Sequence, residues 1–107
     1  MPSQILIAYV TCGSRDEARR IGRALVEERL AACVNLRDHE AIYRWQGAVE
    51  TAEEIGLLAK TTDAAWPALQ DRVRALHSYE LPCIVAWPLT EGPVSYTHLT
   101  LPTILRV

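Results

Sequence analysis

Hydrophobic positions along the chain switch between the period of strands and the period of helices. Residues 5–10 form a short apolar run, typical of a strand buried on both faces. Apolar residues then recur at helical spacing to about Arg29, and either Ser14 or Asp16 is a suitable N-cap for that helix. The apolar stripe of this helix consists of Ala18, Ile21, Gly22 and Leu25. We therefore predict a strand followed by an amphipathic helix.

Two long strands are predicted next. Residues 32–46 form one strand with an irregular middle at residues 37–40, where a bulge is expected. Gln46 and Gly47 together are a hairpin signal, and residues 48–61 then form a third strand. This third strand is longer than a single domain of this size needs. Its overhang would leave unpaired edge groups, which indicates pairing with a partner chain.

A second helix and a fourth strand complete the pattern. The helix begins at Asp63, and the strand covers residues 81–87, with Pro82 at its entrance. The core stripe of the helix consists of Trp66, Leu69, Val73 and Leu76. The order βαββαβ predicts an α+β fold of the ferredoxin-like split-βαβ type, an antiparallel sheet with both helices on one face.

Composition narrows the class of protein. The chain has 107 residues, which fits one domain, and a formal net charge of -2, which gives no electrostatic footprint for nucleic acid. No apolar run approaches the ~20 residues that span a bilayer. The first residues lack the basic and apolar regions of a secretory signal. We therefore expect a cytoplasmic protein with neither nucleic acid nor membrane as a partner.

The last fourteen residues differ from the rest of the chain. Residues 94–107 contain no acidic residue and no helical stripe, and Pro102 interrupts their apolar run. This segment is either an extended edge segment or sequence foreign to the domain. We accordingly divide the chain into a domain of residues 1–93 and an atypical tail of residues 94–107, and assign no function to His98.

The three cysteines are too few and too widely spaced for a disulfide framework, so we interpret them as free thiols. Cys12 is expected in an exposed loop after the first strand, either as a packed thiol or as one ligand of a soft-metal site shared with other chains. Cys33 lies where the first helix meets the second strand, and its apolar neighbours favour packing. Cys83 is expected in the core.

A polar group follows the second helix. His77 near a helix C-terminus can stabilise the last carbonyl groups. Alternatively, His77, Tyr79 and Glu80 form a polar cluster in a cleft, where imidazole and carboxylate suit zinc or copper(II). Lys60, in the third strand, belongs either to a solvated face or to an intersubunit ion pair or anion-binding site.

Two aromatic residues share one face of the second strand. Tyr43 and Trp45 are two positions apart, so both rings point to the same side of the sheet. Large rings in this arrangement indicate an interface or a core. They could instead form the wall of a ligand pocket.

These motifs together resemble the CutA divalent-cation tolerance family. The matching stretches are residues 25–36 (LVEERLAACVNL), residues 43–47 (YRWQG), residues 53–61 and residues 77–82 (HSYELP). The resemblance covers about residues 4–92. It implies a ferredoxin-like subunit in a homotrimer of PII-like architecture, with the long strands pairing between subunits. It also implies a non-enzymatic role in tolerance of divalent metals, copper especially.

The resemblance also carries over site residues. Cys12 and Cys33 match positions where a family member carries cysteine. A polar cleft cluster near the subunit boundary is matched by Lys60, His77, Tyr79 and Glu80. We therefore expect weak, non-obligatory binding of copper or another divalent ion, with Cys12 as the better of the two thiols. The expected metal ligands are Cys12, Cys33, His77 and Glu80.

Two alternatives remain beside this interpretation. One is a PII-like sensor that binds a small anionic ligand in the intersubunit cleft, through Lys60 and Tyr79. The other is an acylphosphatase of the same fold, which the sequence disfavours because Arg15 lacks the glycine-rich phosphate cradle that such an enzyme needs.

The chain also departs from the family pattern, with Ser78 in place of a proline and Cys83 in place of a glutamate.

Overall fold

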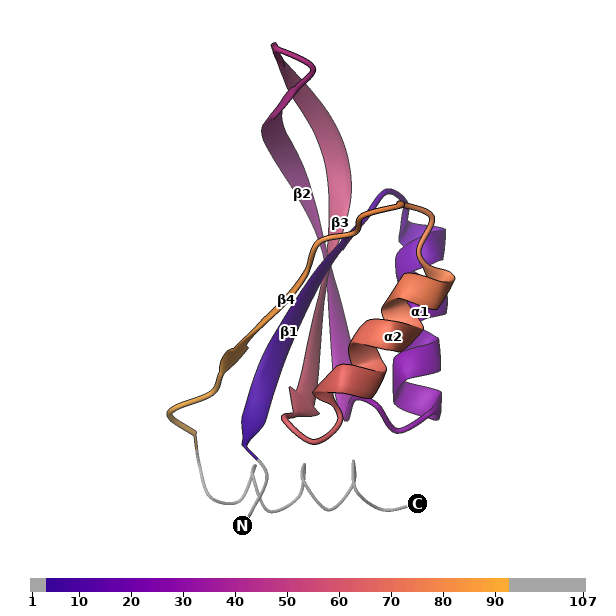
Figure 1. Ribbon diagram of the computed structural model, residues 1–107, viewed down its shortest axis with the longest axis vertical. Coiled ribbons are helices and arrows are strands. Elements are labelled where there is room, and N and C mark those ends of the chain that lie inside the picture. The colour runs from indigo at the N-terminus through magenta and orange to yellow at the C-terminus, as the bar shows by residue number, and fades with distance from the viewer. Residues whose placement is uncertain (1–3, 93–107) are drawn as a thin grey trace.

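In the part of the chain that the structure describes, two helices pack on one face of a four-stranded antiparallel sheet (Figure 1). The computed structural model describes residues 4–92. The elements are β1 (Ile5–Cys12), α1 (Arg15–Glu27), β2 (Cys33–Trp45), β3 (Ala48–Thr62), α2 (Trp66–Leu76) and β4 (Ile84–Pro88). The strand order is β2-β3-β1-β4, and every neighbouring pair is antiparallel. This is the predicted ferredoxin-like α+β fold.

The core lies between the sheet and the two helices. Ser14 is the N-cap of α1, because its hydroxyl accepts a hydrogen bond from the Glu17 N–H at 3.2 Å. The predicted stripe of α1 is buried, as are Leu69 and Val73 of α2. These helix residues pack against every second side chain of β1 and β3, namely the side chains that point toward the helices. The helical spacing of the sequence therefore identified the helix side of the core correctly.

The β2–β3 hairpin is regular along its whole length. Its register runs without interruption from Cys33 opposite Lys60 to Trp45 opposite Ala48, so the predicted bulge is wrong. Residues 37–40 are polar because this part of the hairpin leaves the helix layer, where polar side chains need no bulge to reach water. Gln46 and Gly47 both have positive φ, 50° and 83°, as a two-residue type I′ turn requires.

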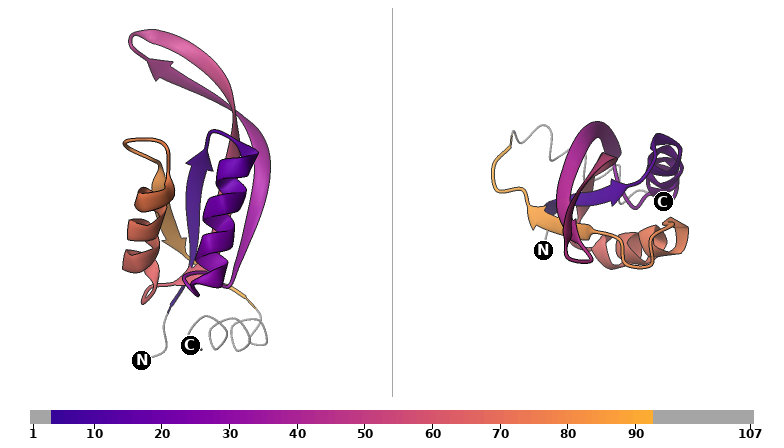
Figure 2. Two further views of the ribbon diagram at one scale, coloured as in Figure 1. Left: turned by 90° about the vertical axis from the view of Figure 1, so that its right-hand side faces the viewer. Right: turned by 90° about the horizontal axis from the view of Figure 1, so that it is seen from above.

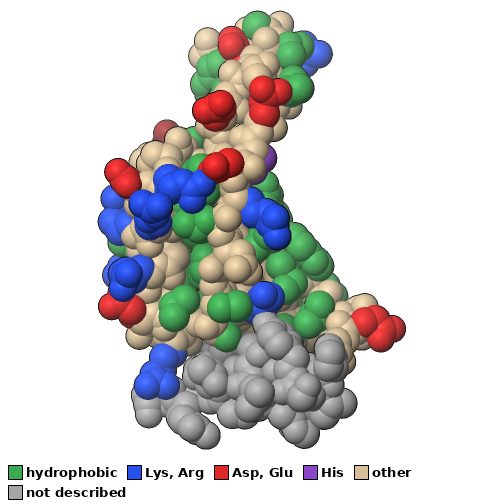
Figure 3. Space-filling view, turned by 180° about the vertical axis from the view of Figure 1, so that it is seen from behind, with side chains coloured by type: hydrophobic (Ala, Val, Ile, Leu, Met, Phe, Trp, Pro, Cys, Tyr) green, Lys and Arg blue, Asp and Glu red, His purple; other side chains and the backbone are tan. Residues whose placement is uncertain are grey.

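Seven residue pairs of this hairpin extend beyond the rest of the sheet. β1 pairs only with Ile55–Thr62 of β3, so among residues 4–92 the pairs from His39 opposite Glu54 to the turn have no third strand beside them. We call residues 39–54 the overhang. It bends over the loop that follows α2 (Figure 2, left), and both hydrophobic and acidic side chains cover it (Figure 3).

Several element ends differ from the prediction. β1 continues to Cys12 because Thr11 and Cys12 still pair with β3. α2 begins at Trp66 rather than Asp63, with Pro67 in its first turn, and β4 begins at Ile84 rather than residue 81. Cys83 therefore precedes the strand and is exposed, so its predicted core position is wrong. The tail and its His98 lie outside the described residues.

Candidate functional site

Three potential metal ligands converge where β1 ends. Cys12 is the last residue of β1, Glu17 lies in the first turn of α1, and His77 is the C-cap of α2. One ligand atom of each lies within 4.8 Å of the other two, and all three residues are buried. Sulfur, carboxylate oxygen and imidazole nitrogen are the donors found at zinc and copper sites. We call these three residues the Cys12 cluster.

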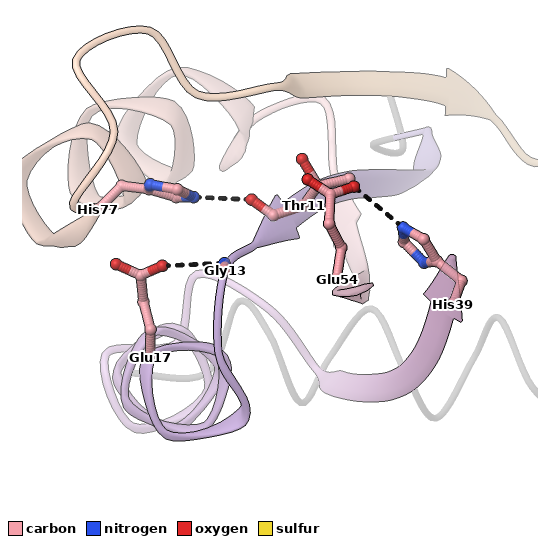
Figure 4. Close-up of polar contacts among 6 residues, drawn as sticks. All are labelled: Thr11, Gly13, Glu17, His39, Glu54 and His77. Atoms are coloured by element: carbon pink, nitrogen blue, oxygen red, sulfur yellow. Dashed lines mark hydrogen bonds and ion pairs between the residues drawn. The ribbon is translucent and has the colours of Figure 1, made fainter. Parts of the chain in front are cut away.

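Glu17 forms hydrogen bonds that connect α1 to two loops, the one after β1 and the one after α2. Its Oε1 accepts from the Gly13 N–H at 3.4 Å, and its Oε2 accepts from the Ser78 N–H at 2.8 Å; Figure 4 shows the contact with Gly13. Burial alone raises the pKa of Glu17, but the hydrogen bonds from Ser78 and Gly13 outweigh burial and lower it. The carboxyl group is therefore ionised at neutral pH. A proline in place of Ser78 could not donate this hydrogen bond.

Both ring nitrogens of His77 are engaged by the backbone. Nε2 lies 2.7 Å from the Thr11 carbonyl oxygen (Figure 4), and Nδ1 lies 3.0 Å from the Tyr79 nitrogen. A carbonyl only accepts, so Nε2 carries the proton and donates, while Nδ1 accepts from the Tyr79 N–H. A metal ion that took His77 as a ligand would have to displace one of these two hydrogen bonds.

Cys12 is fully buried, so the predicted exposed loop position is wrong. The pairing of Thr11 and Cys12 with β3 carries the strand two residues past the apolar run. Burial raises the pKa of the Cys12 thiol to about 12, and the charges of Glu17 and Glu54 add to this effect. The thiol therefore keeps its proton at neutral pH, and a metal ion must displace that proton.

Two other predicted metal ligands stay apart from the Cys12 cluster. Cys33 is half-buried opposite Lys60, whereas Cys12 is opposite Ile55. Positions 55 and 60 are about 17 Å apart along a strand, so the two thiols cannot share one ion within a chain. Glu80 is exposed and borders a separate hollow. Of the four predicted metal ligands, the structure therefore brings Cys12 and His77 together and leaves Cys33 and Glu80 apart from them within the chain.

The predicted anion-binding pair is also separated. Lys60 Nζ donates to the Asn35 Oδ1 at 3.4 Å, on the sheet face that the helices leave open. Tyr79 lies instead beside Gly13, at the end where β1 finishes; a Cβ on that glycine would be 2.8 Å from the Tyr79 Oη. Lys60 and Tyr79 therefore do not form one site in the chain.

A hollow of about 1060 Å³ lies beside the Cys12 cluster. One wall comes from the overhang and the other from the loop after α2. Its lining residues are Tyr43, Trp45, Glu54, Tyr79, Glu80 and Leu81. Tyr43 and Trp45 are 43% and 60% exposed, so of the predicted alternatives the core is excluded.

Comparison with known proteins identifies the family. The model of the CutA1 divalent ion tolerance protein family matches residues 6–100. The chain belongs to this family. It is 52% identical over 91 residues to the divalent-cation tolerance protein CutA of Thermus thermophilus, covering 84% of the chain and 88% of that protein. It is 41% identical to human protein CutA over 90% of the chain, but spans only 54% of the human protein.

Solved structures of CutA proteins share the fold. The Thermus thermophilus divalent cation tolerance protein superposes with a TM-score of 0.88 at 47% identity, over 92% of the chain and 97% of that structure. A protein described as the periplasmic divalent cation tolerance protein CutA of Archaeoglobus fulgidus gives 0.89 at 35% identity, over 94% and 98%. Among residues 4–92 no helix is long and apolar enough to cross a membrane. The cytoplasmic location of this CutA-family chain stays a prediction.

Glu17 is the site residue that the sequence reasoning missed. Ser14 and Glu17 have the spacing of a capping box, in which the glutamate bonds the backbone N–H of the cap residue. In this CutA-family chain the carboxylate bonds Gly13 and Ser78 instead. The spacing therefore pointed to a helix start but not to the contact with the loop after α2, 61 residues away.

Proposed function

We propose that this CutA-family chain acts, without catalysing a reaction, in the tolerance of divalent metal ions, copper especially. The names of its relatives support the general role. The observation that carries metal binding by the chain itself is the convergence of Cys12, Glu17 and His77 within 4.8 Å. The proposed site is therefore the Cys12 cluster.

The donor set fits zinc or copper, but each donor is already occupied. The thiol holds a proton with a pKa of about 12, and the two imidazole nitrogens and both carboxylate oxygens have backbone partners. A bound ion would supply the positive charge that stabilises the Cys12 thiolate beside the Glu17 carboxylate. Because the ion must first displace a proton and a hydrogen bond, binding is weak and strengthens as pH rises.

We also propose a homotrimer of PII-like architecture. The sheet face opposite the helices is partly apolar, and Val85 and Trp87 on it are 49% and 47% exposed. β2 is an edge strand whose outer side has no neighbour within residues 4–92. In an oligomer, further copies of the chain would cover this apolar face and pair with the open edge of β2, so neither would remain exposed to water. Sedimentation equilibrium should give three times the 12.0 kDa chain mass, and a monomer would contradict the trimer.

The anionic-ligand alternative gains no support from the geometry or from the relatives named above. Lys60 donates to the Asn35 side chain and lies apart from Tyr79, its predicted partner. The acylphosphatase alternative is weaker still, because Arg15 forms an ion pair with Asp38. The Thermus thermophilus relative is named for tolerance of divalent cations and not for a reaction.

Metal titration of the full chain tests the proposal. Zn(II), which does not oxidise thiols, is titrated calorimetrically, and Cu(I) is measured anaerobically by competition with a chromophoric chelator. We expect Cys12→Ala to weaken the binding of both ions at least about tenfold. Cys33→Ala is the matched control and should leave both affinities unchanged. Loss of binding in Cys33→Ala with full binding in Cys12→Ala would overturn the assignment.

A further inference from the structure

The loop after α2 begins with two backbone N–H groups that donate to side chains of the Cys12 cluster. This loop comprises residues 78–83, between His77 and the start of β4. The Ser78 N–H donates to Glu17 Oε2 at 2.8 Å, and the Tyr79 N–H donates to His77 Nδ1 at 3.0 Å. Both acceptors belong to proposed metal ligands. The loop and a metal ion therefore compete for the same side chains.

From this competition, we infer that binding of a divalent ion at the Cys12 cluster detaches the loop after α2 from His77. The inference rests on the proposed function, because it requires that the cluster binds metal. It adds that the empty and the occupied cluster hold this loop differently. The conformation of the loop then depends on whether metal is bound.

Ligation through either ring nitrogen of His77 removes the hydrogen bond from Tyr79. The neutral imidazole has one nitrogen lone pair, on Nδ1, and this lone pair already accepts from the Tyr79 N–H. Coordination through Nδ1 displaces Tyr79 directly. Nε2 then keeps its hydrogen bond to the Thr11 carbonyl (Figure 4), the arrangement common in metal-bound histidine. Coordination through Nε2 instead moves the ring proton to Nδ1, so that two N–H groups face each other and the hydrogen bond is again lost.

The hydrogen bond from Ser78 does not have to break. A carboxylate oxygen has two lone pairs, so Glu17 Oε2 can accept from the Ser78 N–H and bind an ion at the same time. The loop therefore stays attached at its first residue and is freed from Tyr79 onward. Tyr79, Glu80 and Leu81 form the wall of the hollow that faces the overhang. Because further copies pair with β2 in the proposed homotrimer, and β2 is one strand of the overhang, the displaced loop lies at the subunit boundary.

The coupling acts in both directions, because linkage makes the effect of the loop on metal binding equal to the effect of metal on the loop. Removing the Tyr79 N–H should therefore strengthen metal binding. A neutral hydrogen bond changes an equilibrium constant by about threefold to tenfold. In calorimetric titration of the full chain, we expect Tyr79→Pro, which has no N–H, to bind Zn(II) more tightly than Tyr79→Ala by this factor. Tyr79→Ala is the matched control, because it also lacks the ring but keeps the N–H.

Amide hydrogen exchange of the unmodified full chain measures the release of the loop directly and needs no variant, so it decides the question even where Tyr79→Pro does not fold. NMR follows the exchange with and without saturating Zn(II). We expect the Tyr79 N–H to exchange about threefold to tenfold faster when zinc is bound. The Asp63 N–H, which donates to the Gln4 carbonyl oxygen at 3.0 Å near the other end of β1, is the control and should exchange at an unchanged rate.

The outcomes distinguish this inference from the proposed function. If zinc binds at Cys12 but the exchange of the Tyr79 N–H is unchanged, the inference is overturned and the metal site stands. Equal zinc affinities of folded Tyr79→Pro and Tyr79→Ala would overturn it in the same way. If the unmodified chain binds no zinc, or Cys12→Ala binds it with full affinity, the proposed function and the inference fail together.

Discussion

Removing the Glu17 carboxylate should destabilise the fold substantially, because Glu17 joins α1 to two loops. Glu17→Ala leaves the Gly13 and Ser78 N–H groups without their acceptor. Hydrogen bonds to a charged group contribute roughly 1.5–3 kcal/mol each. The contribution of the 2.8 Å hydrogen bond from Ser78 should lie at the upper end of this energy range, and that of the 3.4 Å hydrogen bond from Gly13 at its lower end or below. Water can reach both loops in the variant, so we expect a net loss of about 2–4 kcal/mol in the free energy of unfolding.

The same variant should change the pH dependence of stability. The folded-state pKa of Glu17 is lowered from its ordinary value of 4.5. A group of this kind stabilises the fold above its unfolded-state pKa, and this contribution is lost as pH falls through the folded-state pKa. The difference between the unmodified chain and Glu17→Ala should therefore be constant from pH 7 to about pH 5 and shrink below about pH 4.5.

Urea denaturation followed by far-ultraviolet circular dichroism at pH 7, 5, 4 and 3 measures both effects, at one fixed chain concentration because an oligomer's stability depends on concentration. Glu17→Gln, which keeps one acceptor but cannot ionise, should lose less at pH 7, and its difference from the unmodified chain should also shrink below about pH 4.5 because Glu17 of the unmodified chain is protonated there. A loss below about 0.5 kcal/mol at pH 7 is typical of an ordinary surface position and would refute the reasoning. So would a difference that stays constant down to pH 3.

Three further predictions concern the loops around the cluster. Ser78→Pro should lower the free energy of unfolding by about 1–2 kcal/mol by urea denaturation, the lost hydrogen bond outweighing the added chain stiffness, while Ser78→Ala keeps the backbone donor and should change it far less. Cys83 should react with a thiol-modifying disulfide reagent in the folded chain at pH 7.4, whereas Cys12 should react only after denaturation, as mass spectrometry of labelled peptides would show. Gly13→Ala should displace the Tyr79 ring, because the new Cβ would lie 2.8 Å from the Tyr79 Oη, and so should shift the Tyr79 ring signals in NMR; unchanged ring signals would contradict the close contact.

Local features of the fold were predictable because the signals lie within a few residues of one another. The Ser14 cap, the stripe of α1 and the turn at Gln46 and Gly47 all follow from short-range spacing, and all are confirmed. Residues 37–40 are also a local pattern, but the bulge predicted from their polar side chains is absent from the uninterrupted β2–β3 register. A strand that leaves the helix layer shows a polar pattern without a bulge, and the sequence does not show where that layer ends.

Features that depend on long-range pairing were not predictable. Cys12 is buried because Ile55, 43 positions later, extends the pairing of β1, and nothing near Cys12 in the sequence indicates this. Glu17 meets Ser78 only because α1 and α2 pack side by side on the sheet. His77 was predicted as a site residue from its chemistry, but its ring contacts required the structure. The separation of Cys33 from Cys12 likewise follows from the register of β2 and β3.

The proposed function requires that a divalent ion binds this CutA-family chain at the Cys12 cluster by displacing the thiol proton. Calorimetric titration of Zn(II) at pH 7 in buffers of different ionisation enthalpy counts the protons released. Because the thiol has a pKa of about 12, we expect about one proton released per ion at this residue, and an affinity that rises about tenfold per pH unit. Cys12→Ala should abolish both. Zinc binding of unchanged affinity in Cys12→Ala, with no proton released in the unmodified chain, would show that the ion does not bind at Cys12.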